Sequence, residues 1–211
     1  MKVLLFGASG NIGSAIAAEL VSRGHQVTGV TRTGKLDNPA VQAVAGDVSD
    51  AAQVAELAEG HDLVASAVGP RIGIDNDREI LVGATRGLIE GLQKAGGKRL
   101  VALGGAGSLR TPAGHRVVDD SHFPEMWKAN ALAQIEALGL YRETEGLDWT
   151  YISPAKLIEP GERTGTYRLS GEDLLVDEAG QCKISIPDYA VAFVDQIEGG
   201  EHLRTRVSVA Y

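Results

Sequence analysis

The chain has 211 residues, a formal net charge of −8, and 44% hydrophobic and 23% charged residues. This length suits one α/β domain with a buried core, and the acidic balance without a basic patch argues against general nucleic-acid binding. The apolar run at 3–6 is too short for a membrane span or signal segment. Cys182 has no partner for an internal disulfide, which fits a reducing compartment. We therefore expect a single cytoplasmic domain over residues 1–211, without a membrane or nucleic-acid partner.

Short aliphatic or β-branched runs alternate with longer segments of helical period, a pattern typical of parallel βαβ units. Strands are predicted at residues 2–6, 26–31, 41–45, 63–68, 99–103, 149–152 and 204–210. Helices are predicted at 12–23, 50–58, 79–95, 124–145 and 188–198, loops at 32–40 and 71–78, and a small hairpin-like insert at 166–169 and 174–176. The sequence thus predicts an α/β, Rossmann-type doubly wound, mostly parallel sheet with helices on both faces.

The first predicted strand leads into a glycine-rich turn, residues 7–13 (GASGNIG), and a helix follows at once. A glycine at such a turn avoids a Cβ clash, a second lets backbone approach a phosphate, and a third lets the helix pack on the strand. The N–H groups and positive dipole at the helix start bind an anion. A plain tight turn is the alternative, but the strand-turn-helix context favours a dinucleotide pyrophosphate. The predicted contacts are Gly7, Ser9, Gly10, Asn11, Ile12 and Gly13.

The end of the second predicted strand bears on the choice of cofactor. A carboxylate there binds the ribose 2′-hydroxyl of NAD, whereas an arginine suits the 2′-phosphate of NADP. The chain reads Thr31-Arg32-Thr33, and no carboxylate follows until Asp37. Arg32 offers a planar guanidinium for a phosphate dianion, although a solvated loop arginine is the alternative. We therefore expect NADP(H) in preference to NAD(H).

These residues and several later stretches resemble the atypical short-chain dehydrogenase/reductase group known as the NAD(P)H-binding or NmrA-like family. Within it, the chain resembles small bacterial relatives of biliverdin/flavin reductases. The matching segments are GASGNIG (7–13), GDV (46–48), SAVGP (66–70), GGAGSL (104–109), LDWTYISPA (147–155), GERTGTYRL (161–169) and ISIPDYAVA (184–192). They extend over most of the chain, and the last two are more specific to this family than the first two.

The resemblance implies further cofactor contacts at the carboxyl ends of the predicted strands. Asp47 and Val48 would lie by the adenine, although Asp47 also suits a helix N-terminus. Small residues at the fourth, fifth and sixth strand ends would let the ribose and nicotinamide pass close to backbone. The implied residues at these ends are Ala67, Val68, Gly69, Gly104, Gly105 and Pro154.

No tyrosine of this chain has a lysine four residues later, so the proton-transferring pair of typical short-chain dehydrogenases is absent. In the flavin-reductase relatives, a serine near the fifth strand and a histidine after the sixth approach the substrate. Their positions correspond here to Gly105 and Lys156, with Ser108 nearby but offset. Lys156 and Ser108 are therefore weak catalytic candidates. The resemblance allows direct hydride transfer, which requires mainly positioning, to a flavin- or quinone-type acceptor.

Two polar segments have competing interpretations. His115 and His122 flank Asp119-Asp120, but no helix or strand fixes this group, so a flexible acidic loop is expected and no metal site. Arg163 and Tyr167 would either line a substrate pocket or form a salt-bridged surface turn.

At the level of function, the leading hypothesis is an NADPH-dependent reductase of a small acceptor, and the alternative is a non-catalytic NADP(H)-binding sensor or scaffold. An epimerase-like enzyme fits poorly because the chain leaves little room for a substrate domain.

Overall fold

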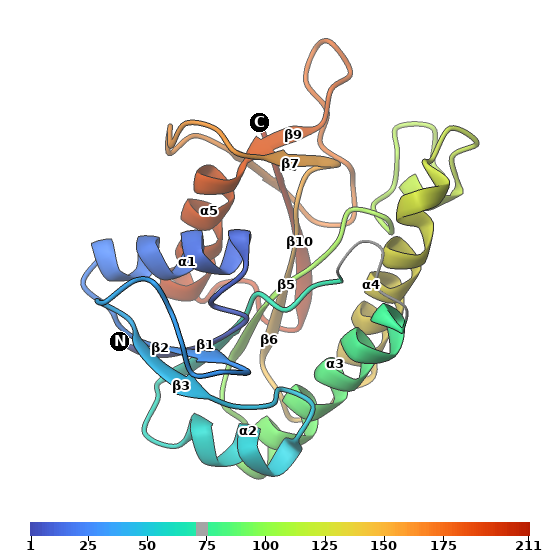
Figure 1. Cartoon of the computed structure of the whole chain (residues 1–211). Helices are drawn as coiled ribbons and strands as arrows, with labels where there is room; N and C mark the ends of the chain where they lie inside the picture. The colour runs from blue at the N-terminus through green and yellow to red at the C-terminus, as the bar shows by residue number, and fades with distance from the viewer. Residues whose placement is uncertain (71–75) are drawn as a thin grey trace.

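The computed structural model describes residues 1–70 and 76–211 (Figure 1). In these residues the strands form an eight-stranded sheet in the order β3-β2-β1-β4-β5-β6-β10-β8. Its members are β1 (Lys2–Phe6), β2 (Gln26–Thr31), β3 (Gln42–Ala45), β4 (Leu63–Ser66), β5 (Leu100–Leu103), β6 (Trp149–Ser153), β8 (Arg168–Ser170) and β10 (Thr205–Ala210). The β8–β10 pair is antiparallel and the other pairs are parallel. Because β1 pairs with both β2 and β4, the strand order reverses there, where such sheets place a ligand crevice.

Helices cover both faces of the sheet, as the sequence predicts (Figure 1). The helices are α1 (Asn11–Ser22), α2 (Ala51–Ala58), α3 (Asp77–Lys94), α4 (Glu125–Glu143) and α5 (Ile186–Gly199), with a 3-10 turn η1 (Val117–Asp119). Helices α1 and α5 pack on each other over one face, and α2, α3 and α4 pack side by side over the other. A separate apolar cluster lies under each layer. The predicted Rossmann-type doubly wound α/β fold is confirmed.

Side-chain capping explains where two of the helices begin. The Asp50 carboxylate accepts hydrogen bonds from the N–H groups of Ala52 and Gln53, so α2 begins after it. Ser185 accepts from the Asp188 N–H, and Pro187 lies in the first turn of α5. The start of α2 agrees with the prediction to within one residue, whereas α5 begins two residues before the predicted start at 188.

The C-terminal part differs from the predicted hairpin-like insert. Strand β8 is present but pairs with β10, while residues 174–176 form no strand. The Leu174 N–H donates instead to the Arg110 carbonyl at 2.8 Å, which diverts the second segment away from the first. A separate parallel pair, β7 (Leu157–Glu159) and β9 (Lys183–Ser185), joins the regions after β6 and before α5. The hairpin prediction is therefore wrong, because both segments find partners elsewhere in the sheet and its neighbouring loop.

Two further predictions concern single segments. Cys182 is buried, and its sulfur accepts a hydrogen bond from the Lys156 N–H, so this side chain packs as part of the protein core. Of the loop predicted at 71–78, residues 71–75 lie outside the described residues. No helix of the described part of the chain is long and apolar enough to cross a membrane.

Candidate cofactor and substrate site

The glycine loop between β1 and α1 is tightly fixed by its own backbone. Gly7 has a φ of +76°, in the left-handed region that favours glycine, and a Cβ there would lie 2.9 Å from the Ala67 carbonyl carbon. A Cβ at Gly13 would lie 2.1 Å from the Gly7 carbonyl oxygen. These two glycines therefore let α1 pack against the turn and let the turn pack against the end of β4.

Gly10 differs from the other two glycines of the loop. A Cβ at this position would meet only the Gly7 carbonyl oxygen, at an ordinary contact distance of 3.5 Å, so no described neighbour requires a glycine there. The first helical hydrogen bond of α1 runs from the Ser14 N–H to the Gly10 carbonyl, leaving the N–H groups of Asn11, Ile12 and Gly13 without an acceptor in the helix. Open space beside these donors fits a pyrophosphate. The predicted contacts Ser9 and Asn11 are exposed on the same loop.

The predicted adenosine contacts lie further along the same sheet edge. Arg32 is exposed directly after β2, and its guanidinium makes no hydrogen bond or ion pair with any described residue. Asp47 accepts hydrogen bonds from the Ser49 N–H at 2.9 Å and the Ser49 hydroxyl at 2.7 Å, so it shapes the turn before α2. Val48 is half-buried and packs against the cluster under α2, α3 and α4. Adenine binding by Asp47 and Val48 stays a prediction.

A cavity of about 610 Å³ opens at the carboxyl ends of β5 and β6, beside the first turn of α1. The predicted site residues among its lining are Ile12, Gly69, Gly104, Gly105, Pro154 and Lys156. Residues from the glycine loop and from three strand ends therefore meet at one place. The other predicted cofactor residues, including Ala67 and Val68 after β4, are not part of this lining, and their cofactor contacts stay predictions.

The far wall of the cavity consists of residues that the sequence reasoning missed. They come from the segment before α4, from α4 itself and from β7: Phe123, Trp127, Asn130, Ala131, Gln134 and Leu157. Asn130 and Gln134 are four residues apart, and this spacing places both amides on one face of a helix. The spacing of these two polar residues is the signal by which the sequence could have indicated the wall. The periodicity of apolar residues in α4, however, does not show which face of the helix is turned to a cavity.

Packing explains the two glycines after β5. A Cβ at Gly104 would lie 2.3 Å from the Tyr151 ring, and one at Gly105 would lie 2.9 Å from the Gln134 Cβ. Tyr151 is fully buried, and its hydroxyl donates to Gln134 at the backbone carbonyl (3.0 Å) and at the side-chain oxygen. Burial raises the pKa of Tyr151, which keeps the phenol a donor. The glycines thus bring β5 close to β6 and α4 at the cavity wall.

The two catalytic candidates occupy different environments. Lys156 lines the cavity, and its side chain is exposed at the rim. Ser108 does not line the cavity, because its hydroxyl accepts a hydrogen bond of 2.6 Å from the buried guanidinium of Arg206. Burial lowers the pKa of Arg206, and its partner Glu172 opposes that effect. Ser108 is therefore paired with the buried Arg206, whose ion-pair partner Glu172 is half exposed.

The His-Asp segment lies at the mouth of the cavity. Asp120 and His122 are among the lining residues, with the His122 N–H donating to the Asp120 carboxylate at 2.8 Å. Asp119 instead forms a bidentate ion pair with Arg116. Nowhere in residues 1–70 and 76–211 do three or more histidine, cysteine or acidic side chains gather as a metal site would require.

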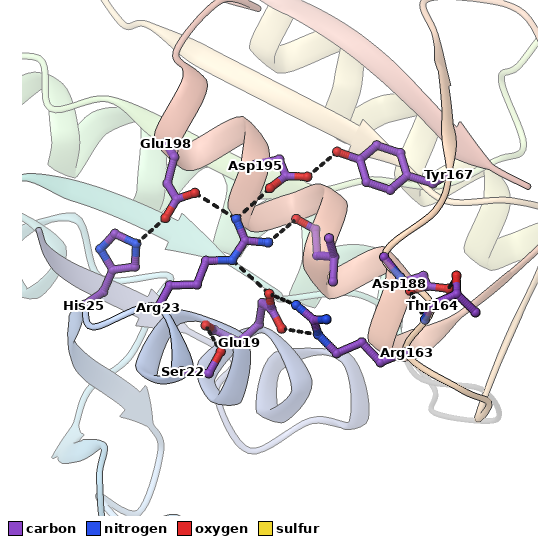
Figure 2. A network of polar contacts seen from close by, with 12 residues as sticks. Glu19, Ser22, Arg23, His25, Arg163, Thr164, Tyr167, Asp188, Asp195 and Glu198 are labelled. Atoms are coloured by element: carbon purple, nitrogen blue, oxygen red, sulfur yellow. Dashed lines mark hydrogen bonds and ion pairs between the residues drawn. The ribbon is translucent and has the colours of Figure 1, made fainter.

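Arg163 and Tyr167 lie away from the cavity, in a polar network between α1 and α5 (Figure 2). Arg163 donates two hydrogen bonds to Glu19 of α1, at 2.8 and 2.9 Å. The Tyr167 hydroxyl donates to Asp195 of α5. Of the two interpretations of these residues, the structure therefore supports the salt-bridged turn, and the substrate-pocket interpretation is wrong. The network satisfies these polar groups within the protein.

The fold, the glycine loop and the adjoining cavity define a dinucleotide-binding protein of the Rossmann class. The sequence profile of the NAD(P)H-binding family matches residues 7–198, and the chain belongs to this family. The predicted resemblance to the atypical short-chain dehydrogenase/reductase group is confirmed, and the cofactor is of the nicotinamide type.

Similar proteins extend over the whole chain. YwnB of Bacillus subtilis, an uncharacterized protein, is 35% identical, and the alignment covers 99% of this chain and 98% of that protein. A Burkholderia pseudomallei structure, provisionally described as an exported protein, has 47% identity and a TM-score of 0.90 with full coverage of both chains. A Streptococcus pneumoniae structure, provisionally described as an NADH-flavin reductase, has 33% identity and a TM-score of 0.89, covering 100% of this chain and 99% of that one.

Proposed function

We propose that this protein is an NADPH-dependent oxidoreductase that reduces a small conjugated acceptor, of flavin or quinone type, by direct hydride transfer. The observation that carries the proposal is the cavity, which joins the glycine-loop residue Ile12 and the strand-end residues Gly69 and Gly105 to an apolar wall. The resemblance to the Streptococcus pneumoniae protein described as an NADH-flavin reductase supports the same class of reaction.

The lining residues suit a planar acceptor and a reaction that depends mainly on positioning. Bound nicotinamide supplies the hydride in such a reaction. Phe123, Trp127 and Leu157 offer an apolar surface against which a flat ring packs and from which water is displaced. Lys156 and His122 line the cavity and are exposed to solvent. Water can therefore reach this side of the cavity and supply the proton that the reduced product takes up. No tyrosine-lysine relay is needed for an acceptor that delocalises the incoming charge over its own ring system.

The preference for NADP(H) is also part of the proposal. Arg32 follows β2 with its guanidinium unpaired among the described residues, and the 2′-phosphate of NADP(H) is the anion expected at this strand end. A carboxylate there would have favoured the 2′-hydroxyl of NAD(H) instead.

We also propose that the protein is cytoplasmic. The proposal rests on Cys182, which is buried and forms no disulfide, as is usual in a reducing compartment, and cell fractionation tests it.

The direct test is NADPH oxidation with a panel of acceptors. We expect turnover with menadione, riboflavin and FMN, and little with cyclohexanone, whose isolated carbonyl requires a proton donor in the transition state. Absence of turnover above background with every conjugated acceptor would overturn the proposal. A cyclohexanone rate equal to that with menadione would contradict the positioning mechanism.

A non-catalytic NADP(H)-binding sensor is the second candidate, favoured by the absence of any tyrosine with a lysine four residues later. A sensor must distinguish the two redox states of the cofactor by affinity. Calorimetric titration separates the candidates: distinct affinities for NADP⁺ and NADPH without turnover support a sensor, whereas turnover with a conjugated acceptor supports the reductase.

A further inference from the structure

Gln134 of α4 combines burial with access to the cavity. Only 6% of the residue is exposed, yet it lines the cavity between Gly69 and Gly105. Its side-chain nitrogen lies 3.7 Å from the point that a Cβ of Gly69 would occupy, and its Cβ packs against Gly105. The amide nitrogen therefore points to the crevice between the ends of β4 and β5.

The other end of the same amide is held by Tyr151. The Tyr151 hydroxyl faces both oxygens of Gln134, those of the backbone and of the side chain. The tyrosine ring is fixed in turn by Gly104 on one side and by Tyr141, whose ring centroid is 5.8 Å away. A buried phenol on β6 thus orients an amide on α4, and the amide NH₂ faces away from the phenol.

That NH₂ group forms no hydrogen bond with any residue in the described part of the chain. Because Gln134 lines the cavity, this donor is accessible to a ligand, and a ligand that displaces water from it must supply an acceptor. We propose that Gln134, held by Tyr151, is the positioning donor of the cavity and binds an uncharged ligand oxygen. The oxygen is either a ribose hydroxyl of the cofactor or a carbonyl of the acceptor.

The chemistry of the helix face supports this ligand class. Asn130, one turn before Gln134, adds a second uncharged amide to the same wall, and it too makes no hydrogen bond with the described residues. Amides donate hydrogen bonds but do not release protons at ordinary pH, so this face orients a neutral oxygen and does not protonate it. The acceptor alternative rests on the proposed function, whereas the cofactor alternative rests only on membership of the family.

Three variants test the inference. Gln134→Met removes the donor but keeps the length of the side chain, and Tyr151→Phe removes the hydroxyl that orients it. Tyr141→Phe is the matched control, because it removes a buried phenol hydroxyl from the same aromatic cluster and keeps the ring that packs against Tyr151. Calorimetry with NADP⁺ is one arm. The other arm measures the binding of two acceptors to the NADP⁺-loaded protein: menadione, which has carbonyl groups, and phenazine methosulfate, which has none. Binding is followed by tryptophan fluorescence, because Trp127 lines the cavity.

We expect Gln134→Met to lose about tenfold in affinity, which is the effect of one well-formed hydrogen bond. The loss should appear either for NADP⁺ or for menadione, and the affinity for phenazine methosulfate should not change. The first result identifies a ribose hydroxyl and the second a carbonyl. Tyr151→Phe should lose a smaller factor in the same arm, and Tyr141→Phe should match the wild type. Gln134→Met also removes the side-chain acceptor of the Tyr151 hydroxyl, which keeps the Gln134 backbone carbonyl as a partner. The melting temperature of unliganded Gln134→Met should therefore fall no further than that of Tyr151→Phe.

Affinities within about twofold of the wild type in both arms for Gln134→Met would overturn the inference. A lower melting temperature combined with unchanged affinities would show a structural role instead. If the wild type binds both ligands but never oxidises NADPH, the proposed function fails while the inference is still decided by the binding arms.

Discussion

Two polar regions of the molecule differ in how their groups are paired. In the network between α1 and α5, Glu19 accepts from Arg163 and Arg23, and Arg23 also reaches Asp195 and Glu198 at 2.6 and 2.7 Å (Figure 2). Along the cofactor edge and the cavity, the Arg32 guanidinium and the Gln134 amide nitrogen have no partner among the described residues. The charged network therefore joins α1 to α5 through contacts within the protein, whereas the two unpaired groups are the ones that we assign to a ligand.

The glycine loop both packs within the protein and faces the proposed cofactor. Gly13→Ala is therefore expected to have the largest effect. Its Cβ would lie 2.1 Å from a backbone oxygen that cannot move without opening the turn. We expect destabilisation of about 1–3 kcal/mol or more and loss of NADPH binding. Thermal denaturation and calorimetry measure the two effects.

Gly10→Ala is the matched control for the loop, because its Cβ meets only ordinary contacts within the protein. We expect a melting temperature near that of the wild type and a large loss of NADPH affinity, since the methyl group occupies the space left for the pyrophosphate. Unchanged NADPH affinity in Gly10→Ala would contradict the assignment of this space to the cofactor.

Arg32→Asp should affect binding without affecting stability. Losing a charge-assisted contact to the 2′-phosphate is expected to weaken NADPH by about 10- to 100-fold and NADH far less. Arg86→Asp on α3 makes the same change of charge at another exposed position and should leave both affinities near those of the wild type. Equal losses for NADPH and NADH would sink the phosphate assignment.

Glu19→Gln should do the opposite and affect stability without affecting binding. Hydrogen bonds from Arg163 and Arg23, opposed by burial, hold the pKa of Glu19 below its usual range. Its ionisation therefore stabilises the fold above the usual glutamate pKa of about 4.3, and this contribution is lost as the pH falls toward the lower folded-state pKa. We expect Glu19→Gln to cost about 1–3 kcal/mol at neutral pH and to flatten the acid limb of stability.

Urea unfolding from pH 7 down to pH 3 checks the Glu19 prediction, with Glu90→Gln on α3 as an exposed control. NADPH affinity should be unchanged in both variants. A Glu19→Gln protein as stable as the wild type at pH 7 would show that the network does not hold α1 to α5.

Lys156→Met is expected to have the smallest effect. An exposed ammonium at the cavity rim attracts a phosphate only weakly, so the KM for FMN should rise about two- to fivefold, while the KM for riboflavin stays the same. Steady-state kinetics with the two flavins measures the difference. A large fall in kcat with riboflavin would instead make Lys156 a proton donor.

Most of the fold was predictable because the βαβ alternation, the glycine loop and the helix caps are local signals. The hairpin-like insert was not, since the partners of residues 168–170 and 174–176 come from β10 and from Arg110, far away in the sequence. Three-residue strands such as β7 and β9 are also too short to show a period.

The cofactor side of the site was predictable to a larger extent than the acceptor side. Gly69, Gly105 and Pro154 could be placed because strand ends of a parallel sheet meet at one edge. The amide wall of α4 could not be placed, because the role of Gln134 depends on Tyr151, seventeen residues later on another element. The two interpretations of Arg163 could not be separated for the same reason, because its partner Glu19 is 144 residues away.

The most direct test of the account is a crystal structure of the NADP⁺ complex. We predict the pyrophosphate on the glycine loop beside Gly10, the 2′-phosphate against Arg32, and the nicotinamide entering the cavity between Gly69 and Gly105 with its C4 open toward Trp127. A nicotinamide that lies outside this cavity, with its C4 closed off from the α4 wall, would contradict the account.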